Sequence, residues 1–324
     1  MSRSKEKIFK AVIIGAGKIS CFYDRPQDTR RCATHAHAYY NSDRISLEGI
    51  FDIDKNKALR AARIWETRAY KSMGKMLSVV RPDIVSITVP TEFHYPVFKE
   101  VLKYEPGLIF MEKPLTLRLE DSVRIVEEAE KKSIIVAVNY QRQWMKEIIR
   151  IQERFISGGY GNFLSAVVYY NRGLRNNGSH FLHLLISFLG DAVDIEVLGK
   201  RIDYSRDDPT LDFAIRFKKG RAYFVGLDKR YYGIGEIDLF FENGRITFRD
   251  FSRNMVRYMI THDRYYSEEK VLRPQNPVTT SPALLEDVVA NLADALENKA
   301  RLLVRGTDAL KTEIILAKIM ENVH

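Results

Sequence analysis

Five short apolar runs constrain the fold of this chain more than any other feature of its sequence. They cover residues 9–14, 47–51, 84–89, 108–111 and 134–138. Short runs in which most residues are apolar are typical of strands buried on both faces, as in a parallel sheet. The stretches 55–65 and 119–132 between them place apolar residues at helical spacing. This alternation predicts an α/β domain with a doubly wound parallel sheet.

The pattern changes after about Gln141. Longer segments there alternate aromatic and polar residues, which is typical of strands with one exposed face. They cover residues 163–170, 211–217, 222–227, 237–241 and 245–248, and helical patterns follow over 282–298 and 307–322. Glu242-Asn243-Gly244 has the composition of a hairpin turn. We therefore expect a C-terminal α/β domain with an open, mainly antiparallel sheet, and a division of the chain into 1–138, 139–306 and a last helix over 307–324.

The formal net charge of +9 raises the question of a nucleic-acid partner. Lysines and arginines are interspersed with acids, and the sequence has no block of five or six like charges and no motif of a DNA- or RNA-binding module. We therefore expect no nucleic-acid partner. A positive field of this kind also attracts a dinucleotide or an anionic substrate.

No segment of the sequence has the composition of a membrane span or a secretory signal. The longest apolar runs are far shorter than the roughly 20 residues of a membrane helix, and residues 1–10 are charged and lead into a strand. We therefore expect no membrane partner and a cytoplasmic location. In that reducing compartment Cys21 and Cys32 are expected to be free thiols.

A glycine-rich turn, Gly15-Ala16-Gly17-Lys18-Ile19-Ser20, follows the first predicted strand directly. Glycines here allow a tight turn and a close approach to a pyrophosphate, whose charge meets N–H groups at a helix N-terminus. Gly15, Gly17, Lys18 and Ile19 are the expected cofactor contacts, although Ser20 stands where the usual fingerprint has a third glycine. An ordinary turn is the alternative, and the strand in front of it favours a nucleotide site.

The second predicted strand ends in Phe51-Asp52. A carboxylate there accepts hydrogen bonds from the adenine ribose and repels a 2′-phosphate, so the expected cofactor is NAD, with NADP disfavoured. Asp52 comes later than the usual spacing of about 20 residues after the turn. An insertion over residues 21–33 explains the delay, and because loops of this length are often functional we expect it to fold over the cofactor or substrate as a lid.

Two further groups of residues follow strand ends, where open α/β sheets bind their ligands. Pro90, Thr91 and His94 come after the strand 84–89 and are expected to line the cofactor channel. Met111-Glu112-Lys113-Pro114 comes at the end of the strand 108–111, which places Glu112 and Lys113 at the cofactor. A solvated surface lysine is the alternative for Lys113.

A third motif, Asn176-Asn177-Gly178-Ser179-His180-Phe181-Leu182-His183, opens an apolar helical stretch. His180 and His183 lie three residues apart, as two metal ligands on one helical face do, yet no third ligand at a metal-like spacing accompanies them. We therefore expect no metal. For His180 the alternative is a histidine whose hydrogen bonds are satisfied by its neighbours.

These motifs follow one another in a recognisable order. The glycine turn, Glu112-Lys113-Pro114, Asn139-Tyr140-Gln141-Arg142, the turn 157–161 and Gly178-Ser179-His180 are arranged as in the Gfo/Idh/MocA oxidoreductase family, which the chain resembles over nearly its whole length. The resemblance implies that 1–138 is a Rossmann domain that binds NAD(P) and that 139–306 is a substrate and oligomerisation domain. It also implies a dehydrogenase or reductase that acts on a hydroxyl or keto carbon of a sugar, cyclitol or sugar nucleotide.

The resemblance also assigns roles to single positions. Lys113 matches the lysine near the reacting hydroxyl and the nicotinamide, and His180 matches the general acid/base. The common pattern has one acid four residues before this histidine and another three residues after it, where this chain has Asn176 and His183. An amide orients an imidazole but has no charge that would raise its basicity.

The expected reaction is hydride transfer between a sugar carbon and NAD, with His180 moving the hydroxyl proton and Lys113 hydrogen-bonding the same oxygen. The expected substrate contacts are Tyr140, Arg142, Asn176, Asn177 and His180. Packing between domains is the alternative for Tyr140 and Arg142.

Two other functions use the same architecture. One is a non-catalytic NAD-binding sensor, although the presence of both Lys113 and His180 speaks against it. The other is an NAD-dependent glycoside hydrolase or eliminase, in which hydride transfer is transient. The expected partners are a small sugar-like molecule and further copies of the chain, in a dimer or tetramer formed through the C-terminal sheet.

Overall fold

A computed structural model describes residues 7–29, 31–280 and 285–323, which form two compact units. The first unit takes its residues from Met1–Trp144 and Ala283–Leu310, and the second from Met145–Pro282 and Lys311–His324. This division differs from the predicted one because helix α8 (Leu285–Leu296) packs on α1 (His35–Tyr40), so the chain returns to the first unit near its end. The predicted start of that helix at Pro282 lies outside the described residues.

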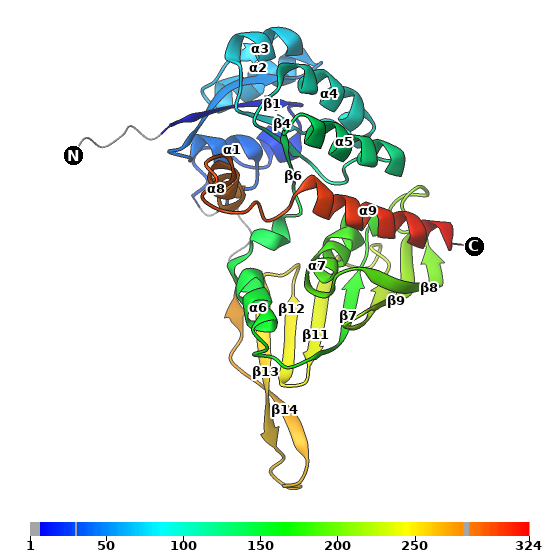
Figure 1. Ribbon diagram of the computed structural model, residues 1–324. Coiled ribbons are helices and arrows are strands. Elements are labelled where there is room, and N and C mark those ends of the chain that lie inside the picture. Colours follow the sequence, from blue (N-terminus) through cyan, green and yellow to red (C-terminus); the bar gives the residue numbers. More distant parts are fainter. Residues whose placement is uncertain (1–6, 30, 281–284, 324) are drawn as a thin grey trace, which may run out of the picture. The chain divides into compact units, whose positions relative to one another are not determined.

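The first unit is built on a six-stranded sheet in the order β3-β2-β1-β4-β5-β6, with every pair parallel (Figure 1). Its strands are β1 (Phe9–Ile14), β2 (Ile45–Phe51), β3 (Ala69–Tyr70), β4 (Ile84–Ile87), β5 (Leu108–Met111) and β6 (Ile135–Val138). Its other helices are α2 (Lys55–Ile64), α3 (Met73–Val80), α4 (His94–Val101) and α5 (Leu119–Lys131). The predicted doubly wound sheet is confirmed.

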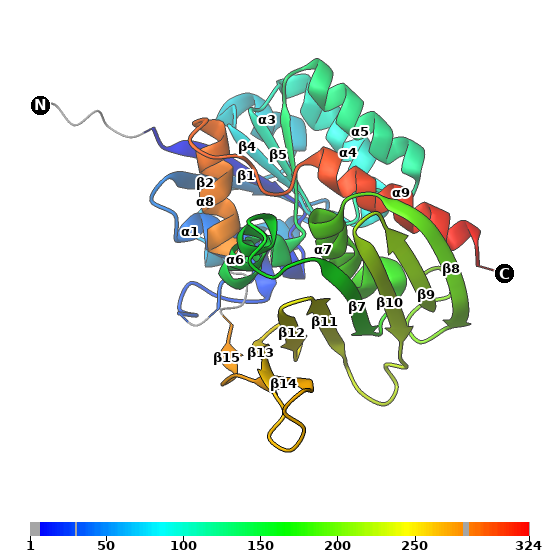
Figure 2. The same ribbon diagram turned by 60° about the horizontal axis from the view of Figure 1, so that its bottom comes forward.

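The strand order reverses between β1 and β4, and this reversal positions the site. The chain runs from β1 toward β3 and from β4 toward β6, and because crossovers between parallel strands are as a rule right-handed, these two directions put the connecting helices on both faces of the sheet (Figure 2). Every residue of β4 and of β5 is buried, as the apolar runs predict. Ligands of such sheets bind beyond the carboxyl ends of the strands at the reversal.

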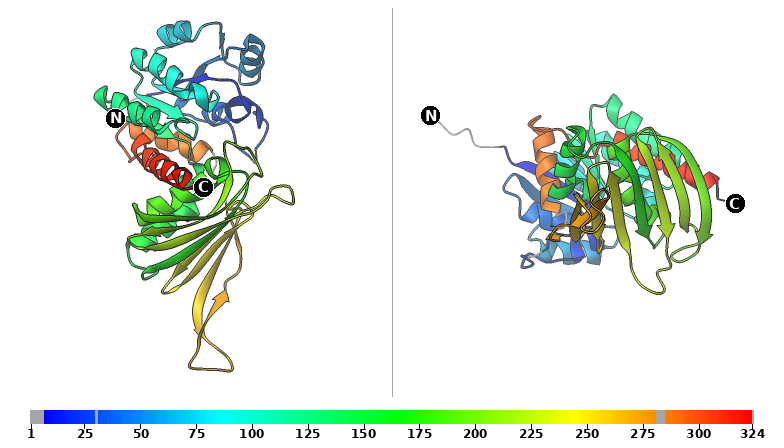
Figure 3. Two further views of the ribbon diagram at one scale, coloured as in Figure 1. Left: turned by 90° about the vertical axis from the view of Figure 1, so that its right-hand side faces the viewer. Right: turned by 90° about the horizontal axis from the view of Figure 1, so that it is seen from below.

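The second unit contains a nine-stranded sheet in the order β14-β13-β12-β11-β7-β10-β9-β8, with β15 paired to β13 (Figure 3). Its strands are β7 (Phe163–Tyr170), β8 (Ala192–Arg201), β9 (Thr210–Phe217), β10 (Gly220–Gly226), β11 (Gly235–Phe241), β12 (Gly244–Arg249), β13 (Asn254–His262), β14 (Lys270–Pro274) and β15 (Val278–Thr279). All pairs are antiparallel except β7 with β10. The sheet is therefore mainly antiparallel, as expected.

Helices of the second unit pack on one side of this sheet. They are α6 (Lys146–Ile156), α7 (Ser179–Leu189) and the later part of α9 (Gly306–Glu321). The Phe155 ring lies 6.2 Å from that of Phe188 on α7 and 5.7 Å from that of Phe241 on β11. Leu164 and Tyr223 are exposed on β7 and β10. Among the described residues, no helix combines the length and the apolar character that crossing a membrane would need.

Candidate functional site

The glycine turn connects β1 to a short helical turn, η1 (Lys18–Phe22). Gly15 has a φ of +100°, and a Cβ placed there would lie 2.8 Å from the backbone of Thr88 and Val89. Only glycine allows this close approach of the turn to the end of β4. Lys18 and Ile19 begin η1, so their backbone N–H groups are the ones that a pyrophosphate would meet.

Ser20 takes the place of the third glycine by closing the turn with its side chain. Its hydroxyl donates to the carbonyl oxygen of Gly15 at 2.6 Å and accepts from the backbone N–H of Gly17 at 2.7 Å. The residue is fully buried. The departure from the fingerprint therefore leaves the turn intact.

Asp52 lies at the end of β2 and connects to the same turn. One carboxylate oxygen accepts from the backbone N–H of Ala16 at 2.6 Å, and the other accepts from that of Asp54 at 2.8 Å. The side chain is half-buried. The acid expected at the adenine ribose is thus held by backbone donors on both of its oxygens.

A cavity of about 750 Å³ opens along this edge of the first unit. Six of the expected cofactor residues line it, namely Gly15, Gly17, Lys18, Ile19, Asp52 and Pro90. Its apolar lining also includes Tyr23 of the insertion 21–33, and Phe93 and Val97 near and on α4, which the sequence did not indicate. A glycine turn, an acid and flat apolar walls suit the pyrophosphate, ribose and adenine of a dinucleotide, so the residues present fit NAD.

Thr91 and His94 are not among the described residues that line this cavity. Thr91 begins the short turn η2 (Thr91–Phe93), and His94 is buried behind it. The imidazole nitrogens of His94 lie 2.9 Å from the carbonyl oxygen of Leu115 and 3.0 Å from that of Val89. Burial lowers the pKa of His94. The ring therefore bridges the segments that follow β4 and β5.

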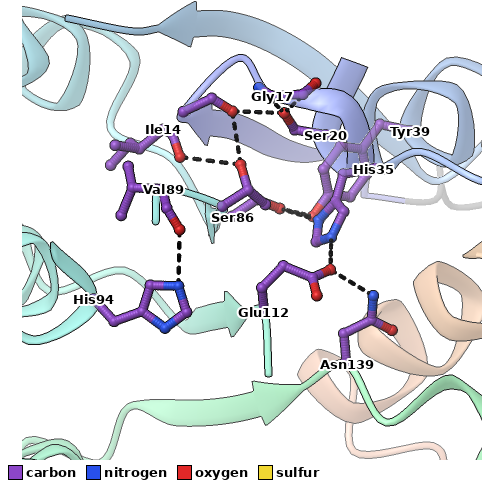
Figure 4. A network of polar contacts seen from close by, with 12 residues as sticks. Ile14, Gly17, Ser20, His35, Tyr39, Ser86, Val89, His94, Glu112 and Asn139 are labelled. Atoms are coloured by element: carbon purple, nitrogen blue, oxygen red, sulfur yellow. Dashed lines mark hydrogen bonds and ion pairs between the residues drawn. The ribbon is translucent and has the colours of Figure 1, made fainter. Parts of the chain in front are cut away.

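Glu112 follows β5 and is held by a buried polar network (Figure 4). Its Oε1 accepts from His35 Nε2 at 2.9 Å and from Asn139 Nδ2 at 2.7 Å. Burial favours the neutral carboxyl, but the hydrogen bonds from His35 and Asn139 and the charge of Lys113 outweigh it and lower the pKa of Glu112. Glu112 is thus an ionised group beside Lys113, which is half-buried.

The insertion is attached to α1 by one buried carboxylate, that of Asp24. It accepts from the backbone N–H of Ala33 at 2.5 Å and from the hydroxyl of Thr34 at 2.5 Å, and His37 Nδ1 lies 3.0 Å from it. Both ends of the loop 25–32 are therefore fixed. Tyr23, next to the loop, reaches the cavity, and the guanidinium of Arg31 lies 5.8 Å from its ring centre.

In the second unit, His180 lies in the first turn of α7, after a short helical turn, η5 (Leu174–Gly178). The carboxylate of Asp208 accepts from the backbone N–H groups of Arg175 at 2.7 Å and Asn176 at 2.9 Å. Gly173 precedes this turn with a φ of +84°, and a Cβ there would lie 2.2 Å from the Asp208 carboxylate. Asp208, which the sequence did not single out, therefore fixes the segment that carries His180.

The other expected substrate residues divide between the two units. Asn177 is buried and donates to the carbonyl oxygen of Asn171 at 3.0 Å, and Asn176 donates to that of Arg172 at 3.0 Å. In the first unit Tyr140 is buried, and burial lowers the pKa of Arg142 to about 10. Asn177 thus helps to build the turn, whereas Asn176 is half-buried.

His183 is buried on α7, where its Nδ1 lies 2.8 Å from the hydroxyl of Thr312. Burial lowers its pKa to about 3, so the ring stays neutral. Among the described residues, no group of three histidine, cysteine or acidic side chains is placed to hold a metal ion.

Comparison with protein families supports the cofactor site. Residues 9–140 match the family Gfo/Idh/MocA, which is described as an oxidoreductase family with an NAD-binding Rossmann fold. UDP-N-acetylglucosamine 3-dehydrogenase of Acidithiobacillus ferrooxidans is 30% identical over 32% of this chain and 32% of its own length. Inositol 2-dehydrogenase of Corynebacterium glutamicum is 29% identical over 53% of this chain and 47% of its own length. The matches thus span about half or less of these relatives.

Solved structures match the fold over nearly the whole chain. A protein described as an NADPH-dependent oxidoreductase, from Desulfitobacterium hafniense, has a TM-score of 0.84 and 17% identity, with 98% of this chain and 96% of that chain covered. An oxidoreductase of Agrobacterium radiobacter, crystallised with NAD⁺, L-tartaric acid and magnesium, has a TM-score of 0.74 and 15% identity, with 97% and 96% covered. At these identities the likeness establishes the fold alone.

Proposed function

Because residues 9–140 match the NAD-binding Rossmann domain of the Gfo/Idh/MocA family, we propose that the chain is an oxidoreductase of this kind and transfers a hydride between NAD and a hydroxyl or keto carbon of a sugar, cyclitol or sugar nucleotide. The observation that carries this proposal is the cavity in which the glycine turn and Asp52 lie together. The names of the relatives, a sugar-nucleotide dehydrogenase and a cyclitol dehydrogenase, support the substrate class.

The proposed cofactor is NAD rather than NADP. A 2′-phosphate on the adenine ribose would face the Asp52 carboxylate, whose charge would repel it. Titration with NADH and NADPH, followed by protein fluorescence, measures the preference. NADH should bind more tightly, and equal or tighter binding of NADPH would contradict the role given to Asp52.

In the proposed mechanism, bound NAD supplies the acceptor or donor of the hydride. His180 takes the hydroxyl proton when the substrate is oxidised and returns it when the carbonyl is reduced. Lys113 donates a hydrogen bond to the same oxygen, and the ionised Glu112 beside it favours the protonated ammonium. Asn176, Asn177, Tyr140 and Arg142 are the proposed contacts to the remaining hydroxyl groups.

Two substitutions test this mechanism. His180→Ala should lose roughly 10² to 10⁴-fold in turnover with NADH binding nearly unchanged, because it removes only the proton carrier. Lys113→Ala should also reduce turnover more than cofactor affinity. His262→Ala and Lys103→Ala are matched controls, because both side chains are exposed. A fully active His180→Ala protein would refute the mechanism.

The substrate screen separates the alternatives. Net formation of NADH with a sugar indicates a dehydrogenase, whereas product formation without net NADH indicates transient hydride transfer. If no sugar is turned over and both variants keep the wild-type response to ligands, the chain is a sensor.

We also propose that the chain forms a homo-oligomer through the open face of its nine-stranded sheet. Apolar side chains are exposed on neighbouring strands of that sheet, including Leu164, which is 52% exposed, on β7 and Tyr223, which is 37% exposed, on β10. Large exposed apolar side chains that gather on one face are typical of interaction surfaces. Light scattering should give a dimer or tetramer, and Leu164→Asp should shift it toward the monomer. A wild-type monomer at micromolar concentration would refute this proposal.

A further inference from the structure

A second buried histidine lies behind the strand ends of the first unit, outside the cavity and outside the proposed proton transfer. His35, on α1, is fully buried, and its ring stacks on Phe110 of β5 with 4.5 Å between ring centres. Its Nε2 lies 2.9 Å from Glu112 Oε1, and its Nδ1 lies 3.1 Å from the hydroxyl of Ser86 on β4. The hydroxyl of Tyr39 lies 2.7 Å from that of Ser86. Figure 4 shows the polar side chains of Tyr39, Ser86, His35 and Glu112 in one line of contacts, which continues from Glu112 to Asn139.

The chemistry of these groups gives the line a direction. An ionised carboxylate only accepts hydrogen bonds, so His35 Nε2 must donate to Glu112. When the ring carries a single proton, that proton is on Nε2, and Nδ1 accepts from the donor in reach, the hydroxyl of Ser86. Ser86 in turn accepts from Tyr39. Each donor meets one acceptor in this arrangement, which is the condition for burying polar groups without a large cost.

The line fixes one side of the Glu112 carboxylate. Oε1 accepts from both His35 and Asn139, and Oε2 points away from both (Figure 4). The side chain is 15% exposed, so the carboxylate is neither free to rotate in solvent nor sealed in the core. The charge of Lys113, the next residue, acts on it. Any displacement of Glu112 is therefore passed to the segment that carries the proposed catalytic lysine.

We propose that His35 is a positioning residue that, supported by Ser86 and Tyr39, holds the Glu112 carboxylate beside Lys113 and so fixes the charge and place of the Lys113 ammonium. His35 does not itself touch the substrate or cofactor, because its side chain has no exposed surface. The link to catalysis rests on the function proposed above, whereas the link from His35 to Lys113 does not.

The first measurement needs neither cofactor nor turnover. The ε-amino group of Lys113 reacts with acetic anhydride only when it is deprotonated, and mass spectrometry gives its rate of acetylation at a fixed pH relative to the exposed Lys99 and Lys103. The ionisable groups around Glu112 are His35, Lys113 and the buried His94. In His35→Leu the carboxylate loses its fixed place beside the ammonium, so Lys113 should be acetylated about three- to tenfold faster.

Conservative substitution separates positioning from packing. His35→Gln has an N–H donor the same number of bonds from Cα as Nε2, so it should restore the wild-type rate of Lys113 acetylation. His37→Gln is the matched control, because His37 is the other buried histidine of α1 and contacts Asp24 instead of Glu112. It should leave the Lys113 rate unchanged. If His35→Leu does not fold, Ser86→Ala removes the donor to Nδ1 and should raise the Lys113 rate in the same direction.

Turnover is the second measurement. With a sugar substrate, His35→Leu should lower kcat about tenfold or more with little change in the Kd for NADH, and His35→Gln should recover most of kcat. The inference is overturned if Lys113 is acetylated at the wild-type rate in His35→Leu. It is also overturned if Lys113 acetylation is as fast in His35→Gln as in His35→Leu. If the Lys113 rates follow the expectation but the wild-type protein turns over no sugar, the proposed function fails while the positioning by His35 stands.

Discussion

Removal of the Asp52 carboxylate should weaken the protein even without a cofactor. Two backbone N–H groups donate to it, at 2.6 Å from Ala16 and 2.8 Å from Asp54. A hydrogen bond to a charged group contributes about 1.5–3 kcal/mol when it is buried, and because Asp52 is half-buried the lower end applies to each bond. Asp52→Ala should therefore cost about 2–3 kcal/mol, and Asp52→Asn, which keeps one acceptor oxygen, about 1–2 kcal/mol.

Thermal unfolding and urea titration of the cofactor-free protein measure this cost. For a unit of this size, each kcal/mol lowers Tm by roughly 2–4 °C, so Asp52→Ala should lower it by about 4–12 °C. Asp54→Asn is the matched control for stability. Asp54 caps α2 by accepting from the backbone N–H groups of Asn56 and Lys57, and asparagine caps a helix about equally well.

A further variant, Asp52→Ser, tests the choice of cofactor. At 5 Å and an effective dielectric constant of about 20, the repulsion between the Asp52 carboxylate and each unit of charge on a 2′-phosphate is about 3 kcal/mol. Salt and solvent reduce this value, so we expect NADH to bind the wild type about tenfold or more tightly than NADPH, and the ratio to fall to about threefold or less in Asp52→Ser. The reasoning is refuted if Asp52→Ala unfolds like the wild type or if the ratio does not change.

Three further predictions concern the insertion, the thiols and the buried histidine of α7. If the insertion is a lid, trypsin cleavage at Arg25 and Arg31 should slow when NADH is added. Equal cleavage rates with and without NADH would exclude closure. Arg30, a third potential cleavage site, lies outside the described residues. Burial raises the pKa of Cys21 to about 12 and raises that of Cys32 further, so neither thiol should react with a disulfide reagent at pH 8 until the protein is unfolded. The folded pKa of His183 is lowered from its ordinary value of 6.5 to about 3, so the unfolded chain binds the extra proton and stability should fall as the pH drops from 6.5 toward 3. About 2 kcal/mol of this loss should appear between pH 7 and 5 in urea titrations, and His183→Asn should lack it.

The parts of the fold that the sequence predicted best are strands whose burial is either nearly continuous or regularly alternating. The bounds of β1, β5 and β7 agree with the predicted runs. A strand that is buried on both faces leaves a continuous apolar pattern in the sequence, and a strand that is buried on one face leaves an alternating pattern. β3 has two residues and is defined only by its pairing with Ile50 and Phe51 of β2. β8 is half-buried to exposed, and Asp194 and Glu196 interrupt its pattern. Such edge strands are determined by partners far away in the sequence.

Sequence reasoning could single out a candidate site residue where backbone geometry requires a particular residue type, and it missed contacts between side chains of distant elements. Gly15 was singled out because a strand that ends in a glycine turn has few alternatives. His35 was missed because two histidines in an apolar helix are typical of core packing, and nothing local shows that one faces Glu112 and the other Asp24. The prediction that His94 contacts the cofactor remains a proposal, and in the described structure its ring bonds to backbone carbonyl groups instead.

The two departures from the dinucleotide fingerprint, Ser20 and the late Asp52, have one structural cause. In the usual arrangement the helix begins at the turn, and the third glycine lets it pack closely on the strand. Here α1 begins only at His35, capped by Thr34, whose hydroxyl lies between the Asp24 carboxylate and the backbone N–H of His37. Ser20 lies instead in the short turn η1, and its hydroxyl closes the glycine turn. The Asp24 carboxylate therefore holds both the end of the insertion, at Ala33, and the hydroxyl that caps α1, at Thr34.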